Sequence, residues 1–151
     1  MANLPTEIEL QVVTPERHVL QETVQSVEVP GKEGYLGILP GHAPLLTELG
    51  IGTLTYKTAS STRFLTVIQG YAEVLPDRVT ALAEAAERPE EIDVERARKA
   101  KAAAEKELAT QGISAEEADE ARTALMRAEL RLQVAARVGH VAAGGTKAAH
   151  A

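Results

Sequence analysis

Hydrophobic and polar residues alternate in several short segments within the first 87 residues. The apolar side of these segments carries Ile8, Leu10 and Val12; Val27 and Val29; Leu65 and Val67; and Val79, Ala81 and Ala83. A period of two indicates strands that bury one face. Turn signals rich in glycine and proline, such as Pro30-Gly31 and Pro76-Asp77, separate the segments. We therefore expect residues 4–87 to form a compact antiparallel β-sandwich.

The pattern changes near Arg88. All seven prolines lie at or before Pro89, and alanine becomes frequent beyond it. Residues 90–111 and 115–138 contain neither glycine nor proline and are rich in Ala, Glu, Arg, Lys and Leu. Such residues favour helices. Apolar residues recur there at steps of three and four: Val94, Ala97, Ala104 and Leu108, then Ala118, Ala121, Leu125, Ala128, Leu132 and Ala135. The sequence predicts two helices that each bury one narrow stripe.

Capping signals set the expected ends of these helices. Gly112 is placed to end the first helix at its C′ position, and Ser114 with Glu117 forms a Ser-x-x-Glu capping box for the second. The connection is so short that the helices must form an antiparallel hairpin. The predicted fold class is therefore α+β, with a β-sandwich domain at residues 1–88, a helical hairpin at 89–138 and a mobile tail at 139–151.

Alanine dominates both helical stripes, which has a functional consequence. Burying a large apolar side chain contributes about 1.5 to 3 kcal/mol, and an alanine methyl contributes far less. We therefore expect the hairpin to be held weakly, so that it can open and bind elsewhere when a partner offers comparable burial.

Composition and charge exclude several classes of function. A net charge of -6, a pI near 5.3 and an aromatic content of 3% argue against a nucleic-acid-binding protein. The chain has no cysteine and no phosphate loop, and its four histidines lack the spacing of a metal site or a nucleophile–base pair. We predict that it is not an enzyme, has no catalytic residue and no metal site, and requires no cofactor. No apolar run approaches the roughly 20 residues of a membrane span, so membrane association would come only through a partner.

The most specific sequence motif lies at residues 31–46, where the chain reads Gly-Lys-Glu-Gly-Tyr-Leu-Gly-Ile-Leu-Pro-Gly-His-Ala-Pro-Leu-Leu. Four glycines and two prolines specify the backbone path closely. The motif resembles the epsilon subunits of bacterial F-type ATP synthases, and the resemblance extends over nearly the whole chain. Two departures are Gln69-Gly70, where many relatives have two glycines, and Tyr35, a position that is often acidic in them.

The resemblance implies a non-catalytic rotor subunit of the central stalk that couples rotation to ATP synthesis and proton transport. The sandwich would dock on the gamma subunit and the c-subunit ring, with Glu33, Tyr35 and His42 at the interface. The hairpin would switch between a compact form and an extended form that inhibits ATP hydrolysis. The complex would place the chain peripherally at the cytoplasmic face of the inner (plasma) membrane. Each residue of the motif at 31–46, taken singly, is equally consistent with a purely structural turn.

A second motif, Ile92-Asp93-x-x-Arg96-Ala97, resembles the ATP-binding motif of the same family. The resemblance implies ATP as a regulatory ligand, with Glu87 on the base side. The alternative is structural, because Asp93 is a good helix N-cap and Arg96 an ordinary solvated charge.

The second helix carries arginines with two implied uses. Arg127 and Arg131 are four residues apart, so they share one face and would clamp a triphosphate in the compact form. In the extended form, Arg122, Arg127, Arg131 and Arg137 would meet the catalytic alpha and beta subunits. The alternative is that basic residues late in a helix complement its dipole. From a different class, the rival function is a freestanding sandwich module that recruits one partner and has no rotary role.

Overall fold

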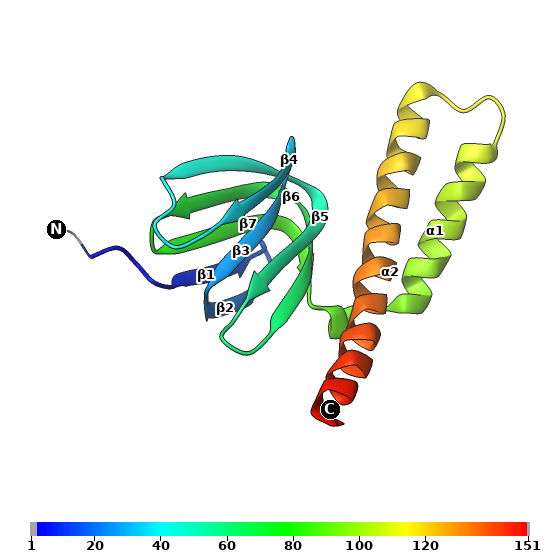
Figure 1. Cartoon of the computed structure of the whole chain (residues 1–151). Coiled ribbons are helices and arrows are strands. Elements are labelled where there is room, and N and C mark those ends of the chain that lie inside the picture. Colours follow the sequence, from blue (N-terminus) through cyan, green and yellow to red (C-terminus); the bar gives the residue numbers. More distant parts are fainter. Residues whose placement is uncertain (1–2, 151) are drawn as a thin grey trace. The chain divides into compact units, whose positions relative to one another are not determined.

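The structure is a computed structural model that describes the backbone of residues 3–150 and the side chains of residues 3–137. The chain divides into two compact units at the peptide between Arg88 and Pro89. The first unit consists of strands and the second of helices, and Figure 1 shows both along the chain.

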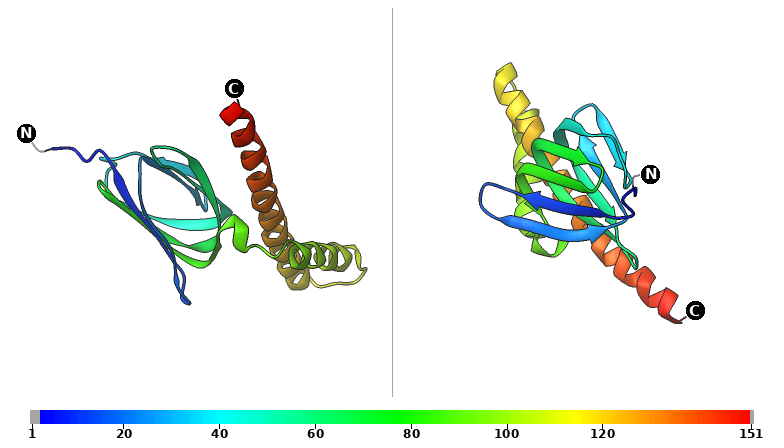
Figure 2. Two further views of the ribbon diagram at one scale, coloured as in Figure 1. Left: turned by 90° about the horizontal axis from the view of Figure 1, so that it is seen from below. Right: turned by 90° about the vertical axis from the view of Figure 1, so that its left-hand side faces the viewer.

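Seven strands form the first unit. They are β1 (Ile8–Val13), β2 (His18–Val24), β3 (Ser26–Gly31), β4 (Gly34–Ile38), β5 (Leu45–Lys57), β6 (Thr62–Leu75) and β7 (Arg78–Glu87). Their order in the sheet is β2-β1-β7-β6-β5-β3-β4, and the sheet curls round an interior (Figure 1, Figure 2). The predicted β-sandwich is therefore confirmed.

One strand pair departs from the antiparallel expectation. β1 and β7 run parallel, from Glu9 opposite Arg78 to Val13 opposite Leu82, whereas the other pairs are antiparallel. No tight turn joins β1 to β7, because β2 to β6 lie between them in the sequence and act as the crossover that a parallel pair needs. Alternation of side chains is the same for either direction, so the pattern does not reveal which one the strands take.

The core lies between the curled layers and is aliphatic. The inward positions predicted on β1, β3, β6 and β7 are all buried, and the core continues into the other strands through Val19, Leu20, Val24, Ile38, Leu49, Leu54, Tyr56, Ala72 and Val74. Gly70 permits a close approach of β6 and β7. Its φ is 124°, and a Cβ there would lie 2.0 Å from the carbonyl oxygen of Leu82, so no other residue fits.

The second unit begins with a short 3₁₀ turn, η1 (Pro89–Glu91), and continues with helices α1 (Val94–Ala109) and α2 (Ala115–His150). The two helices run antiparallel, as Figure 1 shows, so the predicted hairpin is confirmed. α1 begins four residues later than the expected position 90. The reason is local: Pro89 starts the 3₁₀ turn, and the Asp93 carboxylate caps α1 by accepting from the Arg96 N–H at 3.0 Å.

The capping box of α2 is present as predicted. The Glu117 N–H donates to Ser114 Oγ at 3.0 Å, and the Ser114 N–H donates to a Glu117 carboxylate oxygen at 3.2 Å. The end of α1 differs from the expectation, because Thr110 is the C-cap and Gly112, with φ 81°, lies one position beyond C′.

α2 also ends later than the sequence predicts. It continues to His150, whereas the expected end was Val138. The added segment contains no proline, and a glycine costs a helix only about 1 kcal/mol. The mobility predicted for residues 139–151 stays a prediction, and their side chains lie outside the described residues.

Alanines form the contact between the helices. Ala97 and Ala104 are buried on α1, and Ala121 and Ala128 are buried on α2, all at positions of the predicted stripes. The larger stripe residues Leu108, Leu125 and Leu132 are only half-buried.

Candidate partner surfaces and nucleotide motif

An exposed apolar patch lies on the outer face of β5, β6 and β7. Leu46, Tyr71 and Leu82 expose 70%, 54% and 53% of their surface. Tyr71 stands directly opposite Leu82 on β7 and opposite Glu48 on β5, and Leu46 stands opposite Glu73. We call these five residues the outer patch. An apolar centre with a carboxylate rim is typical of a surface that binds another protein.

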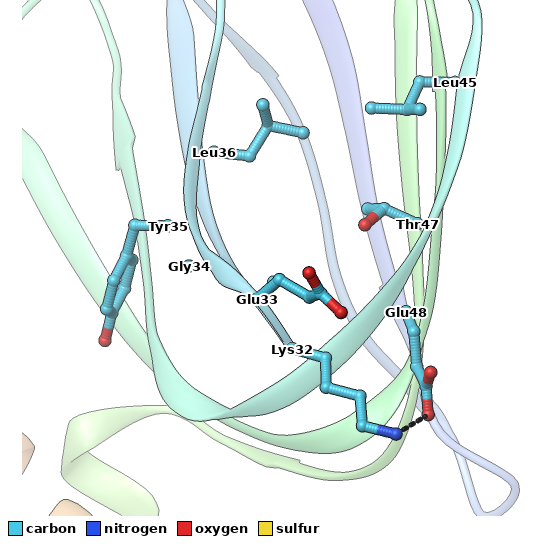
Figure 3. Close-up of a pocket in the computed structure, with 9 residues that line it drawn as sticks. Lys32, Glu33, Gly34, Tyr35, Leu36, Leu45, Thr47 and Glu48 are labelled. Atoms are coloured by element: carbon cyan, nitrogen blue, oxygen red, sulfur yellow. Dashed lines mark hydrogen bonds and ion pairs between the residues drawn. The ribbon is translucent and has the colours of Figure 1, made fainter.

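A cleft of about 430 Å³ opens beside residues 31–46, the glycine–proline loop, whose middle forms β4. Its lining consists of Gly31, Lys32, Glu33, Gly34, Tyr35, Leu36, Leu45, Thr47 and Glu48. Leu36, Leu45 and Thr47 face one another across it, and the Lys32 ammonium pairs with Glu48 at 3.3 Å along one side (Figure 3). The cleft therefore combines apolar walls with a charged rim.

The turn between β3 and β4 holds Glu33 at the edge of this cleft. Gly31 and Gly34 face each other across a two-residue loop made of Lys32 and Glu33. A Cβ on Gly31 would lie 2.6 Å from the carbonyl oxygen of Gly34, so the close approach requires glycine. The predicted interface residue Glu33 is thus exposed on a turn with a fixed path.

Tyr35, the second predicted interface residue, has a structural contact. The ladder between β3 and β5 shifts between Glu28 and Gly31, and Pro30 has no N–H to contribute there. The Tyr35 hydroxyl accepts from the Thr53 N–H at 3.2 Å at this interruption. Its ring points away from Leu36 and the cleft interior, and 59% of its surface remains exposed (Figure 3). The interface role of Tyr35 stays a prediction.

His42 lies in the turn between β4 and β5. Its N–H donates to the Leu39 carbonyl at 3.1 Å, and Nδ1 lies 2.7 Å from the Ala43 carbonyl, to which it can only donate. The Gly41 N–H donates to the Pro76 carbonyl at 2.7 Å, which fastens the loop to the turn before β7. The imidazole is therefore oriented by its own loop, and Nε2 is the nitrogen left for a partner.

The residues of the nucleotide motif have different environments. Ile92 and Ala97 are buried within the hairpin unit, Arg96 is exposed, and the Asp93 carboxylate caps α1. Glu87 belongs to the other unit, as the last residue of β7. Asp93 therefore caps α1, as the structural alternative predicts, and capping does not exclude a role in binding ATP.

The arginines of α2 follow the helix. Arg127 and Arg131 share one face, and the antiparallel arrangement brings this part of α2 to the same end of the hairpin as the start of α1 (Figure 1). Arg122 pairs with Asp119 one turn earlier, and Arg137 is exposed. The level of this part of α2 along the hairpin thus matches the start of α1, while a joint site of Asp93, Arg96, Arg127 and Arg131 and its binding of ATP stay predictions. The described part of the chain holds no group of three His, Asp or Glu that could ligate a metal.

The outer patch was not predicted from the sequence. Its signal was available, because Tyr71 and Leu82 occupy outward positions of β6 and β7, where the alternation calls for polar residues. Reading those positions as a joint surface requires the register that pairs the two strands.

Comparison with known proteins agrees with this architecture. Residues 7–89 match the family described as ATP synthase, Delta/Epsilon chain, beta-sandwich domain, and residues 90–136 match its long alpha-helix domain. The ATP synthase epsilon chain of Solibacter usitatus is 49% identical over 132 residues, which cover 87% of this chain and 98% of that protein. The epsilon chain of Koribacter versatilis is 57% identical over 104 residues, or 69% and 73% of the two chains.

Solved structures extend the comparison to assembled complexes. A chain in the Euglena gracilis mitochondrial ATP synthase structure (OSCP/F1/c-ring, rotational state 1) superposes with a TM-score of 0.74 at 26% identity, covering 85% of this chain and 81% of its own length. A chain of the Tetrahymena thermophila mitochondrial ATP synthase central stalk and c-ring shares the fold, with a TM-score of 0.60 at 12% identity, over 88% and 99% of the two chains.

The fold, the two matched domains and the relatives define a non-catalytic stalk subunit of a rotary ATP synthase, peripheral to the membrane. The chain belongs to the ATP synthase delta/epsilon chain family, and the relatives that it matches over most of their length are epsilon chains. Among the residues that the structure describes, no helix has the length and apolar character to cross a membrane.

Proposed function

We propose that the sandwich attaches this subunit to the rotor through two surfaces, the outer patch and the cleft beside the glycine–proline loop. The gamma subunit and the c-subunit ring are the proposed partners, and the complex stands at the cytoplasmic face of the inner (plasma) membrane. The main observation in support is the exposed apolar centre of Leu46, Tyr71 and Leu82 with carboxylates beside it. Such a surface fits a partner with apolar side chains flanked by Lys or Arg.

A charge in the centre of the outer patch tests this docking. Leu82→Glu should weaken association with the gamma subunit by about tenfold or more, because a buried carboxylate would lack a partner. The fold should be unaffected, since Leu82 points outward. Thr62→Glu, at an exposed position opposite Lys57 at the far end of β6, is the matched control. Co-purification and titration measure both variants. Equal gamma binding by Leu82→Glu and the native chain would remove the outer patch from the interface.

His42 gives a second test at the other surface. His42→Ala should weaken assembly while leaving the melting temperature of the isolated subunit within a degree or two, since its ring bonds only within its own loop. Normal assembly combined with a lower melting temperature would make His42 a structural residue.

The hairpin supplies the proposed regulation. It is compact when α1 and α2 pack together, and it inhibits hydrolysis when extended against the catalytic alpha and beta subunits. Two features support this. The helix contact is made by alanines, and Met126 on α2 exposes 52% of its surface, whereas Leu130 and Val134, four and eight residues later, are already buried. A hairpin that docks on a partner can bury Met126.

ATP is the proposed signal for the compact form. The proposed site joins Asp93 and Arg96 at the start of α1 with Arg127 and Arg131 on α2, and a ligand held by both helices stabilises their pairing. The stabilisation is RT ln(1 + [L]/Kd), about 2.7 kcal/mol at a hundredfold excess over Kd. Glu87 would contact the base side.

Titration calorimetry with ATP, with and without magnesium, tests the site. Arg131→Ala should lower ATP affinity at least tenfold, because it removes a charged hydrogen-bond donor from the triphosphate. Arg137→Ala, off the face shared by Arg127 and Arg131, is the control and should bind normally. Equal affinities in all three proteins would leave the hairpin as a plain partner-binding arm.

Co-purification also separates the rotor role from the rival one. A rotor subunit brings gamma and catalytic subunits with it, whereas a freestanding recruiting module brings a single unrelated partner.

A further inference from the structure

The sandwich unit ends in a cluster of bonds that neither docking surface uses. Arg88 is the last residue before the division between the units. Its side chain donates from Nε and Nη2 to the Val19 carbonyl, at 3.2 and 2.9 Å. The rigid guanidinium directs both N–H groups at one acceptor, which a lysine cannot do. The end of the sandwich is thereby fastened to β2, 69 residues earlier in the chain.

A bulge in β2 presents the carbonyl that Arg88 binds. Val12 stands opposite Leu20 and Val13 opposite His18, so Val19 has no residue opposite it on β1. The extra residue of a bulge lies outside the regular ladder. Val19 nevertheless keeps its side chain buried in the core, which holds the bulge in place. The Arg88 clamp therefore attaches to a fixed point of the sandwich.

Thr66 makes a second attachment one residue before Arg88. Thr66 is fully buried and stands opposite Glu87, the last residue of β7. Its hydroxyl accepts from the Glu87 N–H at 3.0 Å and donates to the Glu87 carbonyl at 3.4 Å. Pro89, which follows Arg88, has no N–H. The bonding that holds β7 in the sandwich thus finishes at Glu87 and Arg88, directly before the helical unit.

The surroundings of Arg88 are polar on one side. Burial, followed by Glu22, raises the pKa of Tyr56 to about 12, and Arg63 and Arg88 act in the opposite direction. The Arg88 guanidinium therefore acts electrostatically on the Tyr56 hydroxyl.

We propose that Thr66 and Arg88 form an anchor that makes Pro89 the pivot of the hairpin. The proposal rests on the mobile hairpin of the proposed function. When the helices move, the anchor holds the end of β7 in the sheet, so movement begins at Pro89 and does not peel the strand away. Arg88 is then a positioning residue of the switch, and the anchor also fixes the main chain of Glu87.

Hydrogen exchange on the full chain tests the anchor. In Arg88→Gln, and in the near-isosteric Thr66→Val, the amides of residues 84–88 should exchange about tenfold faster, since each change removes two hydrogen bonds. Arg88→Lys keeps the charge but loses the pair of N–H donors directed at one carbonyl, so it should behave like Arg88→Gln. The control is Arg78→Gln, at the exposed opposite end of β7, which should leave these amides unchanged.

A glutamate-specific protease gives an independent readout. The native chain should be cut first after Glu90 and Glu91, beyond the anchor, whereas the Arg88 and Thr66 variants should also be cut after Glu84 and Glu87. Unchanged exchange at residues 84–88, or equal acceleration in every strand, would overturn the proposal, because the bonds would then be absent or merely part of the general stability. Hairpin opening is measured separately, by a spin-label distance between α1 and α2. A closed hairpin with an intact anchor would contradict the proposed function and leave the anchor standing.

Discussion

The sandwich and the hairpin are stabilised in different ways. The sandwich buries Ile, Val and Leu side chains almost completely, and its strands depend on one another for their backbone hydrogen bonds. The hairpin buries mainly alanine between its helices, and each helix satisfies its own backbone. Opening the hairpin exposes a few alanine methyls and the half-buried Leu108, Leu125 and Leu132, at about 0.8 kcal/mol for each buried carbon, which is far less apolar surface than the sandwich core buries. Opening the sandwich exposes its aliphatic core and breaks the backbone hydrogen bonds between its strands at the same time.

This difference suits a subunit that must remain attached while part of it moves. The outer patch and the cleft belong to the unit with the large core, so docking does not depend on the state of the helices. The nucleotide motif belongs mostly to the unit with the small contact, where a ligand that binds both helices can change the equilibrium. Rigidity and mobility are thus assigned to separate segments of one chain.

Core truncation should separate the two units most strongly. Leu54→Ala, at a fully buried position of β5, should lower the free energy of unfolding of the sandwich by about 2 to 5 kcal/mol. Ala128→Gly, in the helix contact, should cost the hairpin only about 1 to 2 kcal/mol. All three tyrosines lie in the sandwich, so tyrosine fluorescence in urea reports that unit, and circular dichroism at the helical minimum reports chiefly the hairpin.

Tyrosine fluorescence and circular dichroism together test whether the sandwich and the hairpin unfold separately. If Leu54→Ala shifts both transitions equally, or if the native chain shows one coincident transition, the units unfold as one and the hairpin is part of the sandwich core.

High pH should weaken the sandwich selectively. The pKa of Tyr56 is raised from 10.0 to about 12 in the folded chain, by burial first and then by Glu22. The protonated hydroxyl is therefore favoured by folding. This contribution is complete below pH 10 and is lost as the pH rises from 10 through 12, up to about 3 kcal/mol. Tyr56→Phe should remove that part of the pH dependence, as measured by urea denaturation between pH 8 and 11.5. Identical slopes in both proteins would show that Tyr56 ionises normally.

The smallest expected effect concerns the first turn of α1. Asp93→Ala should destabilise the hairpin by about 1 kcal/mol through loss of the N-cap, whereas Asp93→Asn should keep the cap and cost only a few tenths. The same pair separates capping from ligand binding. Thermal melts at the helical signal, with and without ATP, measure both effects. If Asp93→Asn retains the native melt but loses the shift caused by ATP, the carboxylate acts on the ligand; if both proteins shift equally, it acts only as a cap.

Local chemistry was readable directly from the sequence. Alternation found the inward positions of β1, β3, β6 and β7, and the capping box of Ser114 and Glu117 is formed as expected. The N-cap role of Asp93 was also anticipated, although the first helix was expected to begin earlier, at Glu90. Such features depend on residues that are close together in the sequence, within one helical turn or one strand, so they can be predicted without knowing the tertiary structure.

The sequence by itself thus determined the change from strands to helices along the chain, the inward positions of β1, β3, β6 and β7, and the alanine composition of the helix contact. Only the tertiary structure decided the parallel pairing of β1 with β7, the placement of Tyr71 beside Leu82, the Tyr35 bond to Thr53 and the clamp of Arg88 on Val19. Each of these joins residues on different strands. Their meeting depends on strand order and register, and many registers satisfy the same alternation of apolar and polar residues.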